Sequence, residues 1–163
     1  MLKKRSFFVT FEGIEGSGKS FQSKKLYKNL EKKKVPVILT REPGGTKIGE
    51  QIRDVLLNPT NEGMTLSCEM LLYMASRGQL IEEEIKPAIA AGDVVIADRF
   101  VSATMVYQGF AGGLSVEWIK QVAQGVLKGC WPDLTLIFDL DVATTSQRLH
   151  ATLDRMELKG DSF

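Results

Sequence analysis

The stretch Gly13-Ile14-Glu15-Gly16-Ser17-Gly18-Lys19-Ser20, called the phosphate loop below, constrains this chain more than any other part of it. It matches the pattern G-x-x-x-x-G-K-[ST], follows a β-branched and aromatic run and precedes residues with helical spacing, which is the context that the pattern requires. Its glycines permit positive φ, so backbone N–H groups can approach phosphate oxygens, and the following helix adds its dipole. Lys19 suits β- and γ-phosphates, and the Ser20 hydroxyl suits Mg²⁺. The loop predicts nucleotide-phosphate binding but specifies no reaction.

The rest of the chain alternates short apolar strands with helices. Strands are predicted at about 7–11, 36–40, 94–97 and 134–138, and helices from the phosphate loop to about 33 and at 48–56, 67–91, 115–128 and 143–153. Apolar strands separated by helices indicate a parallel sheet covered on both faces. We find no repeat or linker, so residues 1–163 are expected to form a single α/β domain of three layers, α/β/α. Ligands of such a sheet bind at the carboxyl ends of its strands.

Composition excludes several classes of function. Lys and Arg number 21 and Asp and Glu 20, so the net charge of +1 gives no field that favours nucleic acid or an anionic membrane. No apolar run approaches 18 residues, and no signal peptide is recognisable, so no membrane association is expected. Cys68 and Cys130 lack metal-ligand spacing and favour reduced thiols in a cytoplasmic protein. His150 is the only histidine, which excludes Ser–His and Cys–His catalysis.

Charged residues follow the predicted strands at positions suited to a ligand. Asp98-Arg99 follows the strand 94–97, and Arg41-Glu42 follows the strand 36–40. Tyr73 and Arg77 lie four residues apart on one helix face, where an aromatic plane and a guanidinium suit a planar base. Structural alternatives remain open here: an ion pair between Asp98 and Arg99, core packing of Tyr73 and Arg77, and a surface charge at Arg41.

Four blocks of the sequence together resemble bacterial thymidylate kinases. They are residues 11–20, 41–46, 73–77 and 98–109, in the family's order and near its spacing, and the resemblance covers essentially the whole chain. Guanine-reading Asn-Lys-x-Asp and transporter-type Ser-Gly-Gly-Gln sequences are absent. The resemblance implies a P-loop NTPase-type fold and transfer of the γ-phosphoryl group of ATP to dTMP, giving dTDP and ADP for dTTP synthesis. It also implies Mg²⁺ as cofactor and a homodimer formed by the helices after Gly44 and around 67–80. Phosphoryl transfer depends on alignment and charge stabilisation and needs no histidine.

The resemblance also implies roles for residues around the phosphates. The phosphate loop binds ATP, with Lys19 on the phosphates, and Ser20 and Asp98 orient Mg²⁺. Glu15 holds the 3′-hydroxyl of the acceptor sugar. Arg99 clamps the acceptor phosphate with help from Arg53.

Four further residues are implied to recognise the nucleoside of dTMP. Tyr73 stacks on thymine, and Arg77 reaches its O4 atom. Gln108 hydrogen-bonds to the edge of the base. Tyr107 crowds the 2′ position of the ribose and so favours deoxyribose.

The catalytic arginine is expected outside the phosphate loop, because the variable positions Ile14, Glu15 and Ser17 supply no base. The resemblance assigns it to a lid-like segment at about 148–160, with Arg155 as the first candidate and Arg148 as the second. A solvated helix end is the structural alternative for both.

The sequence departs from the family in three places. Ala103 stands where the family usually has Ser, and the lid-like segment is short and poor in arginine. The resemblance predicts a further helix and a last strand after Phe163, and without them the strand 134–138 is expected to be an apolar sheet edge. These departures leave two alternatives to the kinase reading: a nucleotide-binding protein without turnover, and a kinase for another nucleoside monophosphate.

Overall fold

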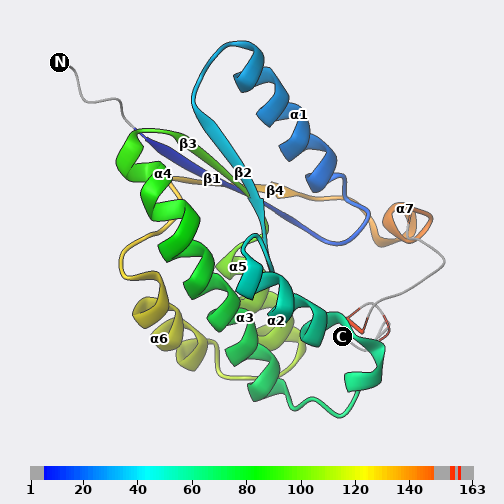
Figure 1. Cartoon of the computed structure of the whole chain (residues 1–163). Coiled ribbons are helices and arrows are strands. Elements are labelled where there is room, and N and C mark those ends of the chain that lie inside the picture. Colours follow the sequence, from blue (N-terminus) through cyan, green and yellow to red (C-terminus); the bar gives the residue numbers. More distant parts are fainter. Residues whose placement is uncertain (1–5, 149–154, 157, 159–163) are drawn as a thin grey trace.

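A four-stranded parallel sheet forms the centre of the molecule (Figure 1). The computed structural model describes residues 6–148, 155, 156 and 158. The strands run in the order β2-β3-β1-β4, and every neighbouring pair is parallel. Their bounds are β1 (Phe7–Gly13), β2 (Val37–Arg41), β3 (Val94–Asp98) and β4 (Leu134–Phe138). The predicted parallel α/β architecture is confirmed, and the carboxyl ends of all four strands share one edge.

Helices cover both faces of this sheet unequally. In Figure 1, α1 lies alone over one face, whereas α3, α4 and α6 lie on the other. The helical segments are α1 (Lys19–Lys32), α2 (Lys47–Leu57), η1 (Pro59–Asn61), α3 (Leu66–Leu80), η2 (Ile81–Ile85), α4 (Lys86–Ala91), α5 (Val101–Thr104), η3 (Met105–Ala111), α6 (Val116–Leu127) and α7 (Val142–Ser146). None of these helices is both long enough and apolar enough to cross a bilayer.

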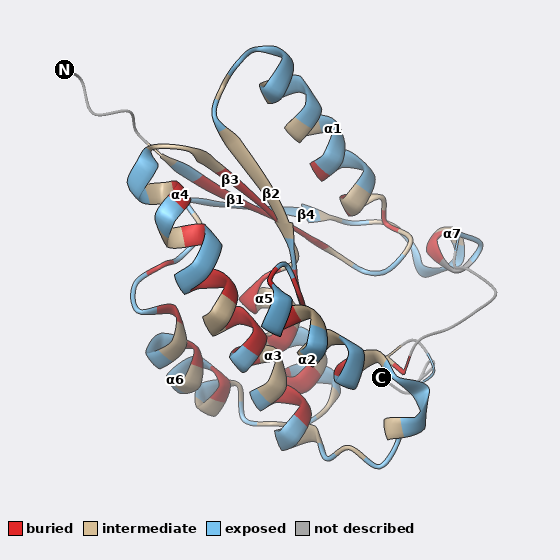
Figure 2. Ribbon diagram, viewed as in Figure 1, coloured by how far each residue is buried: buried red, intermediate tan, exposed pale blue. Residues whose placement is uncertain are grey.

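Two hydrophobic clusters hold the layers together, because successive side chains of a strand point to opposite faces. Phe8, Val95 and Ala97 belong to the larger cluster with buried residues of α3, α4 and α6. Phe11 and Ile96 belong to the smaller cluster, which packs against α1. Figure 2 shows buried residues along the sheet and on the inward sides of the helices. Each fully buried aliphatic or aromatic side chain contributes roughly 1.5–3 kcal/mol, so the two clusters supply most of the driving force.

The helical stretch after β3 was not predicted from the sequence. Residues 101–111 form α5 and then η3, whose hydrogen bonds follow the wider π-helical pattern. Val101, Thr104, Val106 and Tyr107 have only moderate helix propensity, and packing on α6 overrides it. Short π-helical turns recur at functional sites, and this one carries Tyr107 and Gln108.

The last described strand and helix agree only in part with the sequence. β4 is the outer strand of the sheet, and Leu134, Leu136 and Ile137 on it are exposed, which confirms the expected apolar edge. The helix predicted at 143–153 is present as α7, which ends at Ser146. Residues 147 and 148 form a turn, so the predicted helix is wrong there, and the remainder at 149–153 lies outside the described residues.

Candidate functional site

The sheet register brings the segments predicted to bind a nucleotide to one edge. Asp98 pairs with Phe11 of β1 and with Arg41 of β2, and Gly13 pairs with Phe138 of β4. The phosphate loop, the 41–46 loop and residues 98–100, called the β3 turn, therefore begin side by side. The three segments lie close together because parallel strands end at the same edge of the sheet, and the hydrogen bonds between the strands are enough to place them there.

The phosphate loop adopts the conformation that its glycines were expected to permit. Gly18 precedes α1 with φ of 89°. Gly16 has φ of 77°, and a Cβ atom there would lie 2.6 Å from the Thr145 carbonyl oxygen, so only glycine fits. Residues 15–20 line a cavity of about 630 Å³ together with Phe21, Gln22, Phe138, Leu140 and Arg148. The cavity opens at the amino end of α1, where the helix dipole favours anions.

Glu15 joins the two cations that were expected to contact phosphates. Its Oε2 atom lies 2.5 Å from Lys19 Nζ and 2.7 Å from Arg99 Nη2. Burial by itself would raise the pKa of Glu15, but Arg99 and Lys19 outweigh it and lower the pKa to about 2. Burial, with the nearby Arg99 charge, lowers the pKa of Lys19. Because the Glu15 side chain is half-exposed, an incoming phosphate can replace it on both cations.

Arg99 reaches Glu15 from a turn with unusual backbone geometry. Its φ is 72°, in the left-handed region that non-glycine residues rarely adopt. The Arg99 N–H donates to the Phe11 carbonyl oxygen at 3.0 Å, and the Phe100 N–H donates to Glu12 Oε1 at 2.9 Å. The guanidinium carbon lies 5.3 Å from the centre of the Tyr107 ring. The β3 turn thus places Arg99 between the phosphate loop and η3.

Sequence reasoning missed Glu12, the carboxylate that directly precedes the phosphate loop. It is buried at the end of an otherwise apolar strand. Burial raises its pKa to about 7, against the lowering effect of the Phe100 N–H and Arg99. An acidic residue in a buried apolar strand could have drawn attention to it, since such groups are rarely buried without a partner.

Arg77 is completely buried and paired, so its guanidinium does not reach solvent from the core. Its Nε and Nη2 atoms lie 2.7 and 2.6 Å from Glu42 Oε2, and Nη2 donates to Thr104 Oγ1 at 3.2 Å. Its guanidinium also lies 5.4 Å from the centre of the Phe100 ring. Glu42 and Thr104 were not assigned to the site from the sequence. They were missed because the contacts span 35 and 27 residues of chain.

Gln108 and Arg155 meet on one buried carboxylate, that of Glu69. Gln108 Nε2 donates to Glu69 Oε1 at 2.8 Å, and Arg155 Nη2 lies 2.5 Å from Glu69 Oε2. Arg155 Nε also donates to the Leu56 carbonyl oxygen at 2.6 Å. Glu69 is fully buried, and a buried carboxylate needs such partners. The structure therefore packs Arg155 against α2 and α3 and does not bring it to the phosphate loop, where the sequence placed it as the first catalytic candidate.

Arg148, the second lid candidate, does lie at the phosphate loop. Its Nη1 atom donates to the Gly16 carbonyl oxygen at 3.2 Å, and its side chain lines the loop cavity. The lid-like residues 149–154 lie outside the described part of the chain.

Arg53, the remaining arginine that was predicted to contact a phosphate, is bound by the 41–46 loop. Arg53 Nη1 donates to the Pro43 carbonyl oxygen at 2.8 Å, so α2 places this cation against the loop. Arg41 forms an exposed ion pair with Glu50 at 2.9 Å, which agrees with the surface alternative. Tyr73 is half-buried on α3, one turn before Arg77.

The oxygen donors at this edge suit Mg²⁺ better than a transition metal. Ser20 is the second residue of α1, and Asp98 ends β3. Mg²⁺ prefers such oxygen donors, with phosphates and waters completing its shell. Within the described residues, no group of three or more His, Cys, Asp or Glu side chains could hold a metal by itself.

Comparisons with known proteins give one consistent result. A family model described as thymidylate kinase matches residues 11–161. A thymidylate kinase of Halothermothrix orenii is 52% identical over 144 residues, which are 88% of this chain and 69% of the relative. One of Ectopseudomonas mendocina is 48% identical over 96% of this chain and 75% of its own. The crystal structure of thymidylate kinase from Ehrlichia chaffeensis superposes with a TM-score of 0.79 and 38% identity, covering 88% of this chain and 81% of that one.

Proposed function

Since the chain belongs to the thymidylate kinase family, it is an ATP-dependent kinase that phosphorylates dTMP to dTDP, and we propose which of its residues carry out the reaction. Membership disfavours both alternatives, a protein without turnover and a kinase for another nucleotide. The observation that supports the assignment of roles is the shared carboxylate of Glu15, which lies within 2.7 Å of Lys19 and Arg99. Glu15 thus connects Lys19 of the phosphate loop to Arg99, the cation to which we assign the phosphate of dTMP.

On the donor side, we assign ATP binding to the phosphate loop. Its backbone N–H groups and the α1 dipole cradle the phosphates, and Lys19 neutralises charge that develops during transfer. Ser20 and Asp98 would hold Mg²⁺, which supplies charge stabilisation on the phosphate oxygens when it is bound. Ser20 comes from the loop and Asp98 from β3, so both sides of the site contribute oxygen ligands.

On the acceptor side, Arg99 binds the phosphate of dTMP, and Arg53 supports it from the 41–46 loop. As phosphates occupy Lys19 and Arg99, Glu15 is released from them. Its carboxylate then becomes free to accept a hydrogen bond from the 3′-hydroxyl of the acceptor. The exchange needs little energy, because Glu15 is half-exposed in the ion pairs that it leaves.

The base of dTMP is read by side chains that are already fixed. Arg77 is held by Glu42 and Gln108 by Glu69, both inside the protein. Tyr73 stacks on the base, and Tyr107 lies over Arg99, where it restricts the 2′ position of the sugar. Thr104 joins this set through its hydrogen bond from Arg77.

Arg148 replaces Arg155 as our assignment for the catalytic arginine. Arg148 lines the cavity at the phosphate loop, whereas Arg155 is 4% exposed and forms an ion pair with Glu69. Arg148→Ala is expected to lower kcat with little effect on unfolding. Arg155→Ala is expected to lower stability, because it leaves Glu69 buried and without its cation.

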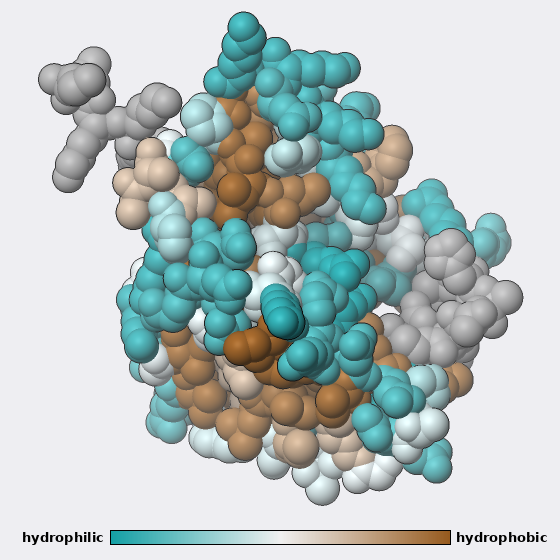
Figure 3. All heavy atoms as spheres, in the orientation of Figure 1, coloured by the Kyte–Doolittle hydropathy of each residue, from teal (hydrophilic) through white to brown (hydrophobic). Residues whose placement is uncertain are grey.

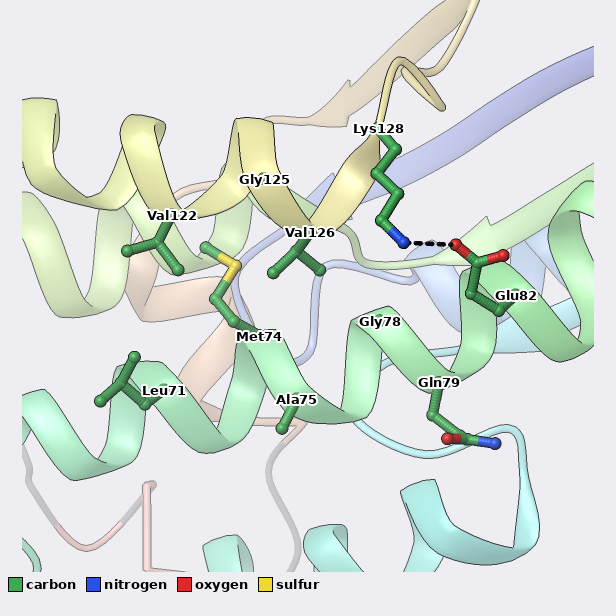
Figure 4. A pocket seen from close by; sticks show the side chains of 10 residues that line it. All are labelled: Leu71, Met74, Ala75, Gly78, Gln79, Glu82, Val122, Gly125, Val126 and Lys128. Carbon is green, nitrogen blue, oxygen red and sulfur yellow. Dashed lines mark hydrogen bonds and ion pairs between the residues drawn. The ribbon is translucent and has the colours of Figure 1, made fainter.

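A homodimer is proposed through the surface of α2, α3 and α6. Ile48 and Val55 on α2 and Leu71 on α3 are exposed, and Figure 3 shows hydrophobic side chains gathered over this part of the molecule. Between α3 and α6 lies a shallow hollow of about 490 Å³ (Figure 4). Its walls include the small residues Gly78 and Gly125, which let another helix approach closely.

Light scattering after size exclusion tests the dimer. Leu71→Glu should yield a monomer, whereas Ile137→Glu on the exposed edge strand β4 should not. A dimer that survives Leu71→Glu would contradict the proposed face.

We propose that the protein is located in the cytoplasm, in keeping with its two free cysteines, Cys68 and Cys130.

The central experiment is a coupled ADP-release assay with ATP, Mg²⁺ and dTMP, compared with dUMP, dCMP and dGMP. We expect turnover that is highest with dTMP and a raised KM for dTMP in Arg99→Ala. Equal rates with all four acceptors would contradict the roles of Tyr73, Arg77 and Gln108. An unchanged KM in Arg99→Ala would contradict the acceptor-phosphate role.

A further inference from the structure

The β3 turn contains a backbone conformation that needs an explanation. Arg99 is one of three non-glycine residues with positive φ in the described part of the chain, with Lys34 and Lys128. Lys34 and Lys128 follow helix ends, where a left-handed residue is ordinary. Arg99 instead joins a strand to a helix, so some specific interaction must maintain its conformation.

Hydrogen bonds from both flanking amides hold the turn. Phe11 accepts from the Arg99 N–H at 3.0 Å, as a continuation of the sheet ladder. Glu12 accepts from the Phe100 N–H at 2.9 Å. Phe100 precedes α5 and its side chain caps no amide of that helix, whereas the Glu12 carboxylate binds the Phe100 amide itself. The Phe100 ring is locked edge-to-face against Phe8 at 5.1 Å.

Glu12 is retained at a position where a carboxylate is unfavourable. It is 5% exposed, and within the described residues it forms no direct ion pair. The charged groups nearest to it are Arg99 on the β3 turn, Arg77 on α3 and Glu42 after β2. An apolar residue would satisfy the core, so the hydrogen bond to Phe100 is the contact that distinguishes Glu12 from an ordinary strand residue.

We propose that Glu12 is a positioning residue for the acceptor phosphate: its Oε1 atom fixes the Arg99–Phe100 peptide, and so aims the Arg99 guanidinium at the mouth of the phosphate loop. Glu12 directly precedes Gly13, so its hydrogen bond to Phe100 also connects the start of the phosphate loop to the β3 turn that contains Arg99. The proposal rests on the role of Arg99 proposed above.

A pair of substitutions separates the hydrogen bond from the charge. Glu12→Gln keeps an oxygen that can accept from Phe100 but removes the charge. Glu12→Asp keeps the charge but is shorter by one methylene and cannot reach the amide. We expect Glu12→Asp to raise the KM for dTMP roughly tenfold, the effect of leaving a buried N–H unpaired, with the KM for ATP little changed. Glu12→Gln should stay within about threefold of the wild type. Equal losses in both variants, or no loss in Glu12→Asp, would overturn the proposal.

A double-mutant cycle tests whether Glu12 acts through Arg99. In the Arg99→Ala background, Glu12→Asp should raise the KM for dTMP no further, because the group that it positions is gone. An additive effect would show that Glu12 acts on the fold instead. If Arg99→Ala alone leaves the KM unchanged, the role of Arg99 fails. If Arg99→Ala raises the KM for dTMP and Glu12→Asp does not, only the inference about Glu12 fails.

Thermal unfolding distinguishes positioning from general destabilisation. Ser115→Ala removes the side-chain cap of α6, far from the β3 turn, and should lower stability without changing the KM for dTMP. Should Glu12→Asp not fold, hydrogen exchange at the Phe100 amide still decides the matter. We expect that amide to be protected in the wild type and in Glu12→Gln, and rapid exchange in the wild type would overturn the proposal.

Discussion

The phosphate end of the site and its base end use charge in opposite ways. At the phosphate end, Lys19 and Arg99 share the half-exposed carboxylate of Glu15. At the base end, Arg77 pairs with Glu42 and Gln108 with Glu69, and all four side chains are buried. The first arrangement can be exchanged for a ligand at small cost, whereas opening the Arg77–Glu42 pair would leave a buried charge without its partner. Opening the bond between Gln108 and Glu69 would leave a buried amide unpaired, although Glu69 would keep Arg155.

The difference suits what we propose each end to recognise. Phosphates bring their own strong charge, so cations held by a replaceable carboxylate can receive them. A base is planar and neutral, and its recognition depends on donors that keep a fixed direction. We propose that the rigid pairs of Arg77 and Gln108 fix this direction before the ligand arrives, because prior ordering reduces the entropy cost of binding.

The largest effect is expected from breaking a pair at the base end. Arg77→Met should destabilise the protein by about 3–5 kcal/mol, because it leaves Glu42 buried without its cation. Arg41→Met removes the exposed partner of Glu50 and should cost less than about 1 kcal/mol. Urea unfolding measures both, and equal losses would contradict the expected difference between a buried and an exposed ion pair.

At the phosphate end, the largest expected effect is on catalysis. Lys19→Ala should lower kcat roughly 10²- to 10³-fold, since it removes a preorganised charge from the transferred phosphate. Lys24→Ala, on the exposed side of α1, is the matched control and should leave kcat unchanged. Coupled ADP release measures both variants, and a wild-type kcat in Lys19→Ala would refute the assignment.

Glu12, between the two ends, should make stability depend on pH. Its pKa is about 7 when folded and near 4.5 when unfolded, so the folded state binds the proton more tightly. The contribution to stability is full below about pH 4.5 and is lost as pH rises through 7. The wild-type protein should therefore lose about 2 kcal/mol of unfolding free energy between pH 5 and pH 8, and this loss should be absent in Glu12→Gln. Urea unfolding of wild type and variant at both pH values tests this, and parallel pH dependence would contradict it.

The smallest effect is expected at Glu15. Glu15→Gln should change the free energy of unfolding by less than about 1 kcal/mol, because the Glu15 carboxylate is half-exposed and water screens its charge. Glu42→Gln, the matched change in the buried pair, should cost more. Chemical denaturation of the two variants compares them directly. A larger loss in Glu15→Gln would mean that the phosphate end is as rigid as the base end.

Much of the phosphate end could be predicted because its residues are close in the sequence. The loop, the strand before it and the helix after it form one continuous segment, and parallel strands place Asp98 and Arg99 at the same edge. The contacts of Arg99 and Lys19 with Glu15 agree with that expectation. The roles assigned to these residues in binding remain proposals.

The lid is where the sequence reading and the structure differ most. A short arginine-containing segment predicted a cation at the phosphates, with Arg155 as the first candidate and Arg148 as the second. Their order was decided by Glu69, a residue far away in the chain, whose buried carboxylate binds Arg155 and leaves Arg148 at the loop. Nothing in the local sequence around Arg155 contains that information.

The sequence by itself determined the phosphate loop, the order of strands and helices apart from the helical stretch 101–111, and the family, because these depend on residue types at short, fixed spacing. The tertiary structure decided which charges are paired. Glu12 meets Phe100 across 88 residues, Glu42 meets Arg77 across 35, and Glu69 meets Gln108 across 39. A buried carboxylate must find its partner in space, so its role becomes visible only once the sheet and its helices have brought distant segments together.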